Sequence, residues 1–161
     1  MVTKEQWLEL HRVCLDTVRS AIRGLAREGL AAKPLPHDDS IGEQANHVIG
    51  AEGYWLREVH IEPAFGRVES QGWTEAKFLD EFAKIERQYE RILDEKGLDH
   101  DILSGLSRVC QHALYHHARI VTLRWAMEPE WKPAEPLRWE RAVDFITDLL
   151  LVGQEAKPRY D

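Results

Sequence analysis

The sequence has few of the features that mark secreted or membrane-bound proteins. Its 161 residues include only two cysteines, Cys14 and Cys110, which form neither a CxxC pair nor a disulfide framework. We therefore expect two reduced thiols that fill the core. There is no apolar run of about 18 residues that would span a membrane. Residues 3–25, which follow Met1, are charged and amphipathic, unlike a signal peptide. These absences predict a soluble, cytoplasmic protein.

An excess of positive charge is also missing. Asp and Glu outnumber Lys and Arg by 28 to 21, the formal net charge is −7 and the isoelectric point is near 5.6. Nucleic-acid-binding proteins usually carry a basic stripe, so we expect no nucleic-acid partner and no membrane partner. Hydrophobic residues make up 43% of the chain, which is enough for one sizeable core. We predict a single domain over residues 1–161.

Helical periodicity dominates the chain, and no segment has a convincing strand pattern. Capping boxes at Thr3 and Ser40 mark two helix starts, Thr74 marks a third, and Gly97 marks a stop. The five predicted helices span residues 3–27, 40–59, 74–96, 101–127 and 137–152. Long amphipathic helices joined by modest loops predict an all-α helix bundle, a fold that builds metal sites from inward-facing side chains.

What the chain does have is a pair of histidines at helical spacing, in residues 111–116 (QHALYH). Side chains at i and i+4 lie on one helix face, so His112 and His116 can hold one ion. With 8 histidines in the chain, chance supplies about 0.4 such pairs. The environment favours a ligand role, because both histidines lie on one apolar stripe with Val109, Ile120 and Leu123. Unpaired polar groups are costly on a buried face.

A third ligand is needed, and His47 is the best-placed candidate because it lies in the second predicted helix, residues 40–59. Two carboxylates are candidates to accept the free N–H of a ligand or to assist catalysis. Glu43 precedes His47 by one turn, although its role in the capping box is the simpler interpretation. Glu52 follows His47 by five residues and faces about 140° away from it. Gly50 and Ala51 would leave space for a pocket beside the metal.

These residues together resemble the DinB/YfiT-like family of metal-dependent proteins. Residues 40–47 (SIGEQANH), followed by Glu52 and Trp55, resemble the family's second-helix motif, and residues 111–116 resemble its HxxxH motif. The resemblance covers nearly the whole chain. It implies an all-α four-helix bundle of up-down-down-up topology with an additional C-terminal helix. It also implies a divalent metal such as zinc or nickel on His47, His112 and His116, and a homodimer, for which the six tryptophans are further support.

One departure from the family concerns the residues after the last ligand. Family members often continue with Arg-Gly-Gln, whereas His116 is followed here by His117, Ala118 and Arg119. This departure leaves the three ligands unchanged, but it puts in doubt any role in substrate binding that the family would assign to these positions. We expect His117 to face a neighbouring helix or solvent. The histidines without a partner at useful spacing are interpreted as surface residues: His11, His37, His60 and His100.

Three functions are compatible with such a site. A dication on neutral ligands lowers the pKa of a bound thiol or water. The first function is thiol-dependent S-transfer to a small electrophilic substrate, with Arg119 or Arg124 available for an anionic part of a low-molecular-weight thiol cofactor, unless both are solvated. The second is hydrolysis of an amide or ester, which we rank lower because no HExxH-type glutamate accompanies the pair. The third is non-catalytic metal binding, which a fourth protein ligand would favour.

Overall fold

The computed structural model describes residues 3–132, and all regular secondary structure in that range is helical. This confirms the predicted all-α class for the described part of the chain. The predicted helix over residues 137–152 lies outside the described residues. The elements in chain order are α1 (Lys4–Ile22), α2 (Arg27–Ala31), α3 (Ile41–Glu58), the 3₁₀ helix η1 (Ser70–Gly72), α4 (Glu75–Lys96) and α5 (His100–Met127).

Side-chain caps fix where the long helices begin. Both predicted capping boxes are present, with the Thr3 hydroxyl accepting from Gln6 N and the Ser40 hydroxyl accepting from Glu43 N. Such caps satisfy backbone N–H groups that have no partner inside the helix. Thr74 caps α4, and Gly97 ends it with φ of 73°, a conformation that glycine adopts without strain. These bounds match the predicted helices to within a residue or two.

The first helix was predicted over residues 3–27, and its predicted end is wrong. α1 stops at Ile22, and the chain turns through Gly24 with φ of 76° before α2 begins at Arg27. The left-handed conformation of Gly24 interrupts the helical backbone, although the apolar stripe continues to Leu25. The apolar periodicity did not reveal this break, because Leu25 is buried after the turn and would also lie on the buried face of a continuous helix.

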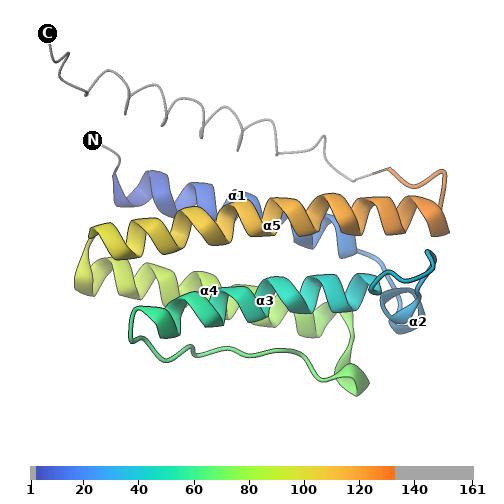
Figure 1. Cartoon of the computed structure of the whole chain (residues 1–161), viewed down its shortest axis with the longest axis horizontal. Helices are drawn as coiled ribbons and strands as arrows, with labels where there is room; N and C mark the ends of the chain where they lie inside the picture. The colour runs from blue at the N-terminus through green and yellow to red at the C-terminus, as the bar shows by residue number, and fades with distance from the viewer. Residues whose placement is uncertain (1–2, 133–161) are drawn as a thin grey trace, which may run out of the picture.

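The four long helices α1, α3, α4 and α5 lie side by side, and the short α2 covers one end (Figure 1). The chain runs one way along α1 and α5 and the opposite way along α3 and α4. The connection between α3 and α4 therefore returns along the length of the helices before η1. α5 packs against both α1 and α3, and α4 also packs against both. This packing places α3 next to α5, the two helices that carry the predicted ligands.

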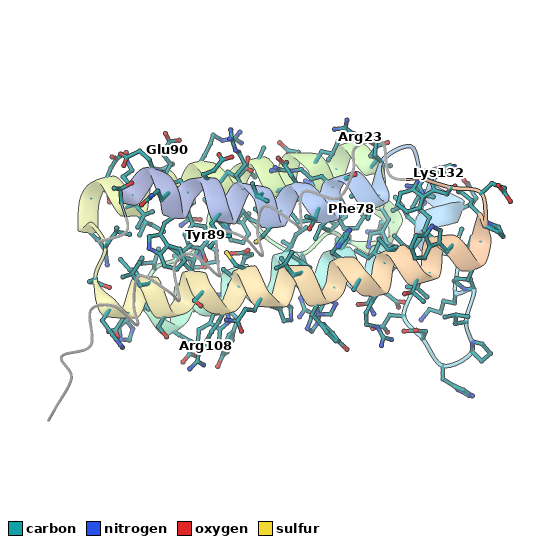
Figure 2. All side chains as sticks on the ribbon, turned by 90° about the horizontal axis from the view of Figure 1, so that it is seen from above. Arg23, Phe78, Tyr89, Glu90, Arg108 and Lys132 are labelled. Atoms are coloured by element: carbon teal, nitrogen blue, oxygen red, sulfur yellow. The ribbon has the colours of Figure 1, made fainter. Side chains whose placement is uncertain are left out.

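The core fills the space between the helices. Figure 2 shows Phe78 and Tyr89 among the side chains between the helices, while Glu90 and Arg108 point outward. Cys14 and Cys110 are free and buried, which confirms their predicted place in the core. Burial of these apolar surfaces is the main term that stabilises the fold, at about 25 cal/mol per Å² removed from water. Among residues 3–132, no helix is both long and apolar enough to cross a bilayer.

Candidate metal centre

α3 and α5 bring the three predicted histidines into one cluster. The ring centroids of His47 lie 4.7 Å from His116 and 5.1 Å from His112, and the latter two rings are 4.3 Å apart. One nitrogen of each ring lies within 4.8 Å of the others, and no other group of this kind occurs in residues 3–132. Three imidazoles at this spacing could hold one metal ion, and imidazole ligands suit zinc, copper, iron and nickel alike.

A glutamine that the sequence analysis did not single out orients one of these rings. The Oε1 atom of Gln44 lies 2.5 Å from His116 Nδ1. An amide oxygen only accepts hydrogen bonds, so Nδ1 of His116 carries the proton and Nε2 carries the lone pair. The Gln44 amide is itself oriented, because its Nε2 donates to Asp39 Oδ2 at 3.1 Å. Its position one turn before His47 was the only signal available in the sequence.

The free nitrogens of the two α5 histidines face each other. Nε2 of His116 and Nε2 of His112 are 3.1 Å apart. Two neutral rings tolerate this approach if His112 donates its Nε2–H, and a cation between two lone pairs also satisfies it. Metal–nitrogen bonds of about 2.05 Å place two ligand nitrogens about 2.9 Å apart at 90° and about 3.3 Å apart at the tetrahedral angle. The observed separation lies between these values, so the pair fits a bound ion.

The two histidines on α5 are held in the neutral form. Burial, followed by the charges of His112, His47 and Arg119, lowers the pKa of His116 to about 4. Burial and then His47 lower the pKa of His112 below its usual value. Neutral imidazole is the form that binds metals, so both rings are ready to act as ligands at pH 7.

Exposure increases across the cluster from α5 to α3. His116 is buried, His112 is half-buried and His47 is exposed. Tyr115, an exposed residue, packs its ring edge against His116 at 5.0 Å. An ion held by the three histidines would therefore have protein on the His116 side and solvent on the His47 side, which leaves positions for water or a substrate.

The two carboxylates that were candidates beside the ligands have other partners. Glu43 accepts from Ser40 N at 2.6 Å and pairs with Lys33 Nζ at 2.8 Å, and these contacts lower its pKa. Its capping role is thus confirmed. Glu52 is fully buried, and its Oε1 lies 3.0 Å from Nε2 of His11.

His11 corrects the sequence analysis, which placed it on the surface. It is only 1% exposed and packs edge-on against Tyr89 at 4.5 Å. The reason is its position in α1, in line with buried Trp7 and Cys14 at helical spacing. His37, His60 and His100 are exposed as predicted.

His117 lies outside the cluster and inside the protein. It is 7% exposed, and burial lowers its pKa to about 4. It therefore faces neighbouring helices, which was one of the two orientations expected.

Neither Arg119 nor Arg124 is free in the way the sequence suggested. Arg124 is 5% exposed, and its Nη1 donates to the carbonyls of Ala21 at 2.8 Å and Arg23 at 2.7 Å. The interpretation of Arg124 as a solvated or cofactor-binding residue is wrong, because it closes the end of α1. Arg119 pairs with Asp38, which raises the pKa of Arg119.

The pocket expected beside Gly50 is also occupied. A Cβ added at Gly50 would lie 2.5 Å from Nε of Arg67, so the Arg67 side chain already covers this position. Any substrate must approach the cluster from another direction, or displace Arg67.

Comparison with known proteins finds no relative of this chain. The chain matches no protein-family model, no curated protein and no solved structure.

Proposed function

We propose that this chain binds one divalent metal ion, zinc or nickel, through His47, His112 and His116, and acts as a metal-dependent transferase. The observation that carries the proposal is the paired approach of the two Nε2 atoms at 3.1 Å, with Gln44 holding the proton of His116 on the opposite nitrogen. His47 lies beside both rings and would complete a three-nitrogen set. Water or substrate would fill the remaining positions.

Membership of the DinB/YfiT-like family belongs to the same proposal. The resemblance implies helices in the order up, down, down, up. The chain directions along α1, α3, α4 and α5 agree with that order (Figure 1). The three histidines that the resemblance assigns as ligands lie in one cluster, which is compatible with the proposal.

Thiol-dependent transfer is the chemistry that we favour. A dication on three neutral ligands would lower the pKa of a small thiol or of water at its open side. Hydrolysis would need a general base facing that side, and Glu52, the carboxylate considered for it, is buried against His11. A small thiol needs no such base once its pKa is lowered. The electrophilic substrate would be a small molecule reaching the cluster from the exposed His47 side.

Metal analysis of protein purified without a histidine tag tests the first half of the proposal. We expect about one equivalent of zinc or nickel per chain. His112→Ala should lose most of the affinity, because two ligands remain, while His100→Ala should keep it, because His100 is exposed and lies outside the cluster. Full metal content in the triple alanine variant of the three ligands would contradict the site.

Cobalt-substituted protein tests the second half. Candidate low-molecular-weight thiols should shift the visible spectrum if sulfur reaches the ion, and conjugation to a generic electrophile should exceed the buffer rate. An unchanged spectrum together with buffer rates would favour hydrolysis or a non-catalytic metal.

A further inference from the structure

The core beside the candidate metal centre holds two polar atoms with complementary chemistry and no partner. Oε2 of Glu52 and Nδ1 of His112 are both buried and make no hydrogen bond. A buried polar atom without a partner costs free energy comparable to its desolvation, so each such atom in a folded protein calls for an explanation. One atom is an acceptor. The other becomes a donor once Nε2 of its ring binds a metal, because the proton then resides on Nδ1.

The packing of α3 against α5 places Glu52 and His112 near the same level of the bundle. The two helices run in opposite directions (Figure 1). Gln44 meets His116, and further along α3 the ring of Trp55 meets the guanidinium of Arg108 at 4.8 Å. Glu52 falls between these two contacts and thus opposite the stretch of α5 just before His112. Helical side chains lean toward the N-terminus of their own helix, so the His112 ring leans toward Glu52.

The charge of Glu52 affects the pKa values of the groups around it. Burial and then His47 lower the pKa of His112, and the Glu52 charge opposes that shift. Burial and then Glu52 raise the pKa of Tyr89, and Cys14, burial and lastly Glu52 raise the pKa of Cys110. The carboxylate thus lies among these residues in the core. Its Oε1 atom pairs with His11, and the Tyr89 hydroxyl is a further hydrogen-bond donor to the carboxylate, while Oε2 has no partner within hydrogen-bond distance.

We infer that Glu52 is a positioning residue of the metal centre, accepting the Nδ1–H of metal-bound His112 directly or through one water molecule. The inference rests on the proposed metal site. Carboxylates that accept the second N–H of a metal-bound histidine fix its tautomer and make it a stronger ligand. The pairing also accounts for a carboxylate in an apolar core, because the bound dication supplies the opposite charge. His11 on the far side of Glu52 anchors the carboxylate to α1.

The variant Glu52→Gln separates this role from a structural one. Glutamine keeps the size of the side chain and removes the charge. We expect metal affinity to fall about 10- to 100-fold and the visible spectrum of the cobalt form to change. The thermal midpoint of the metal-free protein should be kept or raised, because a buried charge is removed. The matched control is Glu81→Gln, a buried glutamate on α4 that is paired with Lys77 and Lys84, and it should leave affinity and spectrum unchanged.

A second measurement covers the case in which Glu52→Gln does not fold. In the zinc-loaded wild-type protein labelled with ¹⁵N-histidine, Nδ1 of His112 should carry a slowly exchanging proton, with the resonance assigned through His112→Ala. A deprotonated or metal-bound Nδ1 would overturn the inference, as would a folded Glu52→Gln variant with unchanged affinity and spectrum. A wild-type chain that binds no metal would contradict the proposed function as well, so the two failures are distinguishable.

Discussion

At the scale of single residues, the candidate metal centre depends on which nitrogen of each histidine carries its proton. Gln44 settles this for His116, because its amide oxygen can only accept. Asp39 in turn holds the Gln44 amide in place. The result is a lone pair on His116 Nε2, aimed at the same point as the neighbouring ring. A metal ion would find this half of the site already oriented.

Replacing Gln44 by alanine should weaken metal binding without unfolding the protein. The His116 ring would lose the partner that fixes its tautomer and orientation, and the affinity should fall about 10- to 100-fold in a calorimetric titration. The matched control is Gln88→Ala. Gln88 is a buried glutamine on α4 whose Nε2 donates to the Glu62 carbonyl at 2.8 Å. Its loss should lower stability and leave the affinity unchanged. Equal affinities for the wild type and Gln44→Ala would show that Gln44 does not orient His116 for metal binding.

At the scale of elements, the side chain of Arg124 links the second half of α5 to the end of α1. Arg124 reaches from α5 to two carbonyls at the end of α1, where helical carbonyls have no partner in the helix. Its guanidinium also lies over the Trp131 ring at 4.4 Å. These contacts, with Glu128 Oε2 3.5 Å from the guanidinium, partner the Nη atoms of a buried charge whose Nε makes no hydrogen bond.

The variant Arg124→Ala should therefore lower the free energy of unfolding by about 3 kcal/mol, measured by urea denaturation. The lost interactions are two charge-assisted hydrogen bonds, and two carbonyls are left to find water. Arg91→Ala, at an exposed position on α4, should change it by less than about 0.5 kcal/mol. A similar small change for Arg124→Ala would mean that these contacts do not stabilise the end of α1.

Local signals in the sequence were sufficient to predict most helix bounds and the histidine pair on α5. Ser40 with Glu43, Thr74 and Gly97 act through backbone groups a few residues away, so their effect can be predicted from neighbours alone. The pair His112 and His116 is likewise a local pattern. Its proximity to His47 was predicted from the place of His47 in the second amphipathic helix, from the tendency of bundles to bring inward side chains together, and from the family resemblance.

Contacts between distant segments could not be predicted in this way. His11 lies on the buried stripe of α1, yet its partner Glu52 is 41 residues away. Arg124 meets carbonyls about 100 residues before it, and Arg67 reaches Gly50 from an irregular connection. A charged residue near a helix face can snorkel to solvent or pair inside, and the sequence does not distinguish the two. The break at Gly24 was missed for a different reason, since glycine is also tolerated inside helices.

At the scale of the whole molecule, the fold keeps neutral histidines inside, and this makes its stability depend on pH. The pKa values of His116 and His117 in the fold are about 4, against the usual value near 6.5. Above pH 6.5 both rings are neutral in the folded and in the unfolded chain, so they do not change the free energy of unfolding with pH. Below pH 6.5 the rings bind protons in the unfolded chain but stay neutral in the folded chain, which favours unfolding.

For the metal-free protein we expect the free energy of unfolding to fall as pH drops from 6.5 toward 4, by up to about 1.4 kcal/mol per pH unit for each of these two histidines. His117→Gln should make the slope shallower, and His100→Gln, at an exposed position, should leave it unchanged. The measurement is a series of urea titrations with a chelator present. A slope that His117→Gln does not alter would show that the ring is protonated inside the fold.

The homodimer implied by the family resemblance stays a prediction about the whole molecule. Three large aromatic side chains on α3 and α5 are about half exposed and are available for a helix-to-helix contact: Tyr54, Tyr115 and Trp125. A pair of chains related by a twofold axis is the commonest arrangement. Light scattering should return about twice the chain mass of 18.7 kDa at micromolar concentration. A value near one chain mass would contradict the dimer.

A crystal structure of the zinc-loaded protein with anomalous diffraction data tests whether His47, His112 and His116 hold one metal ion together. We expect one strong anomalous peak per chain, bound by a nitrogen of each of the three rings at about 2.0–2.1 Å, with Gln44 on His116 Nδ1. An absent peak at saturating zinc, or a peak on other residues with the three rings apart, would contradict this expectation.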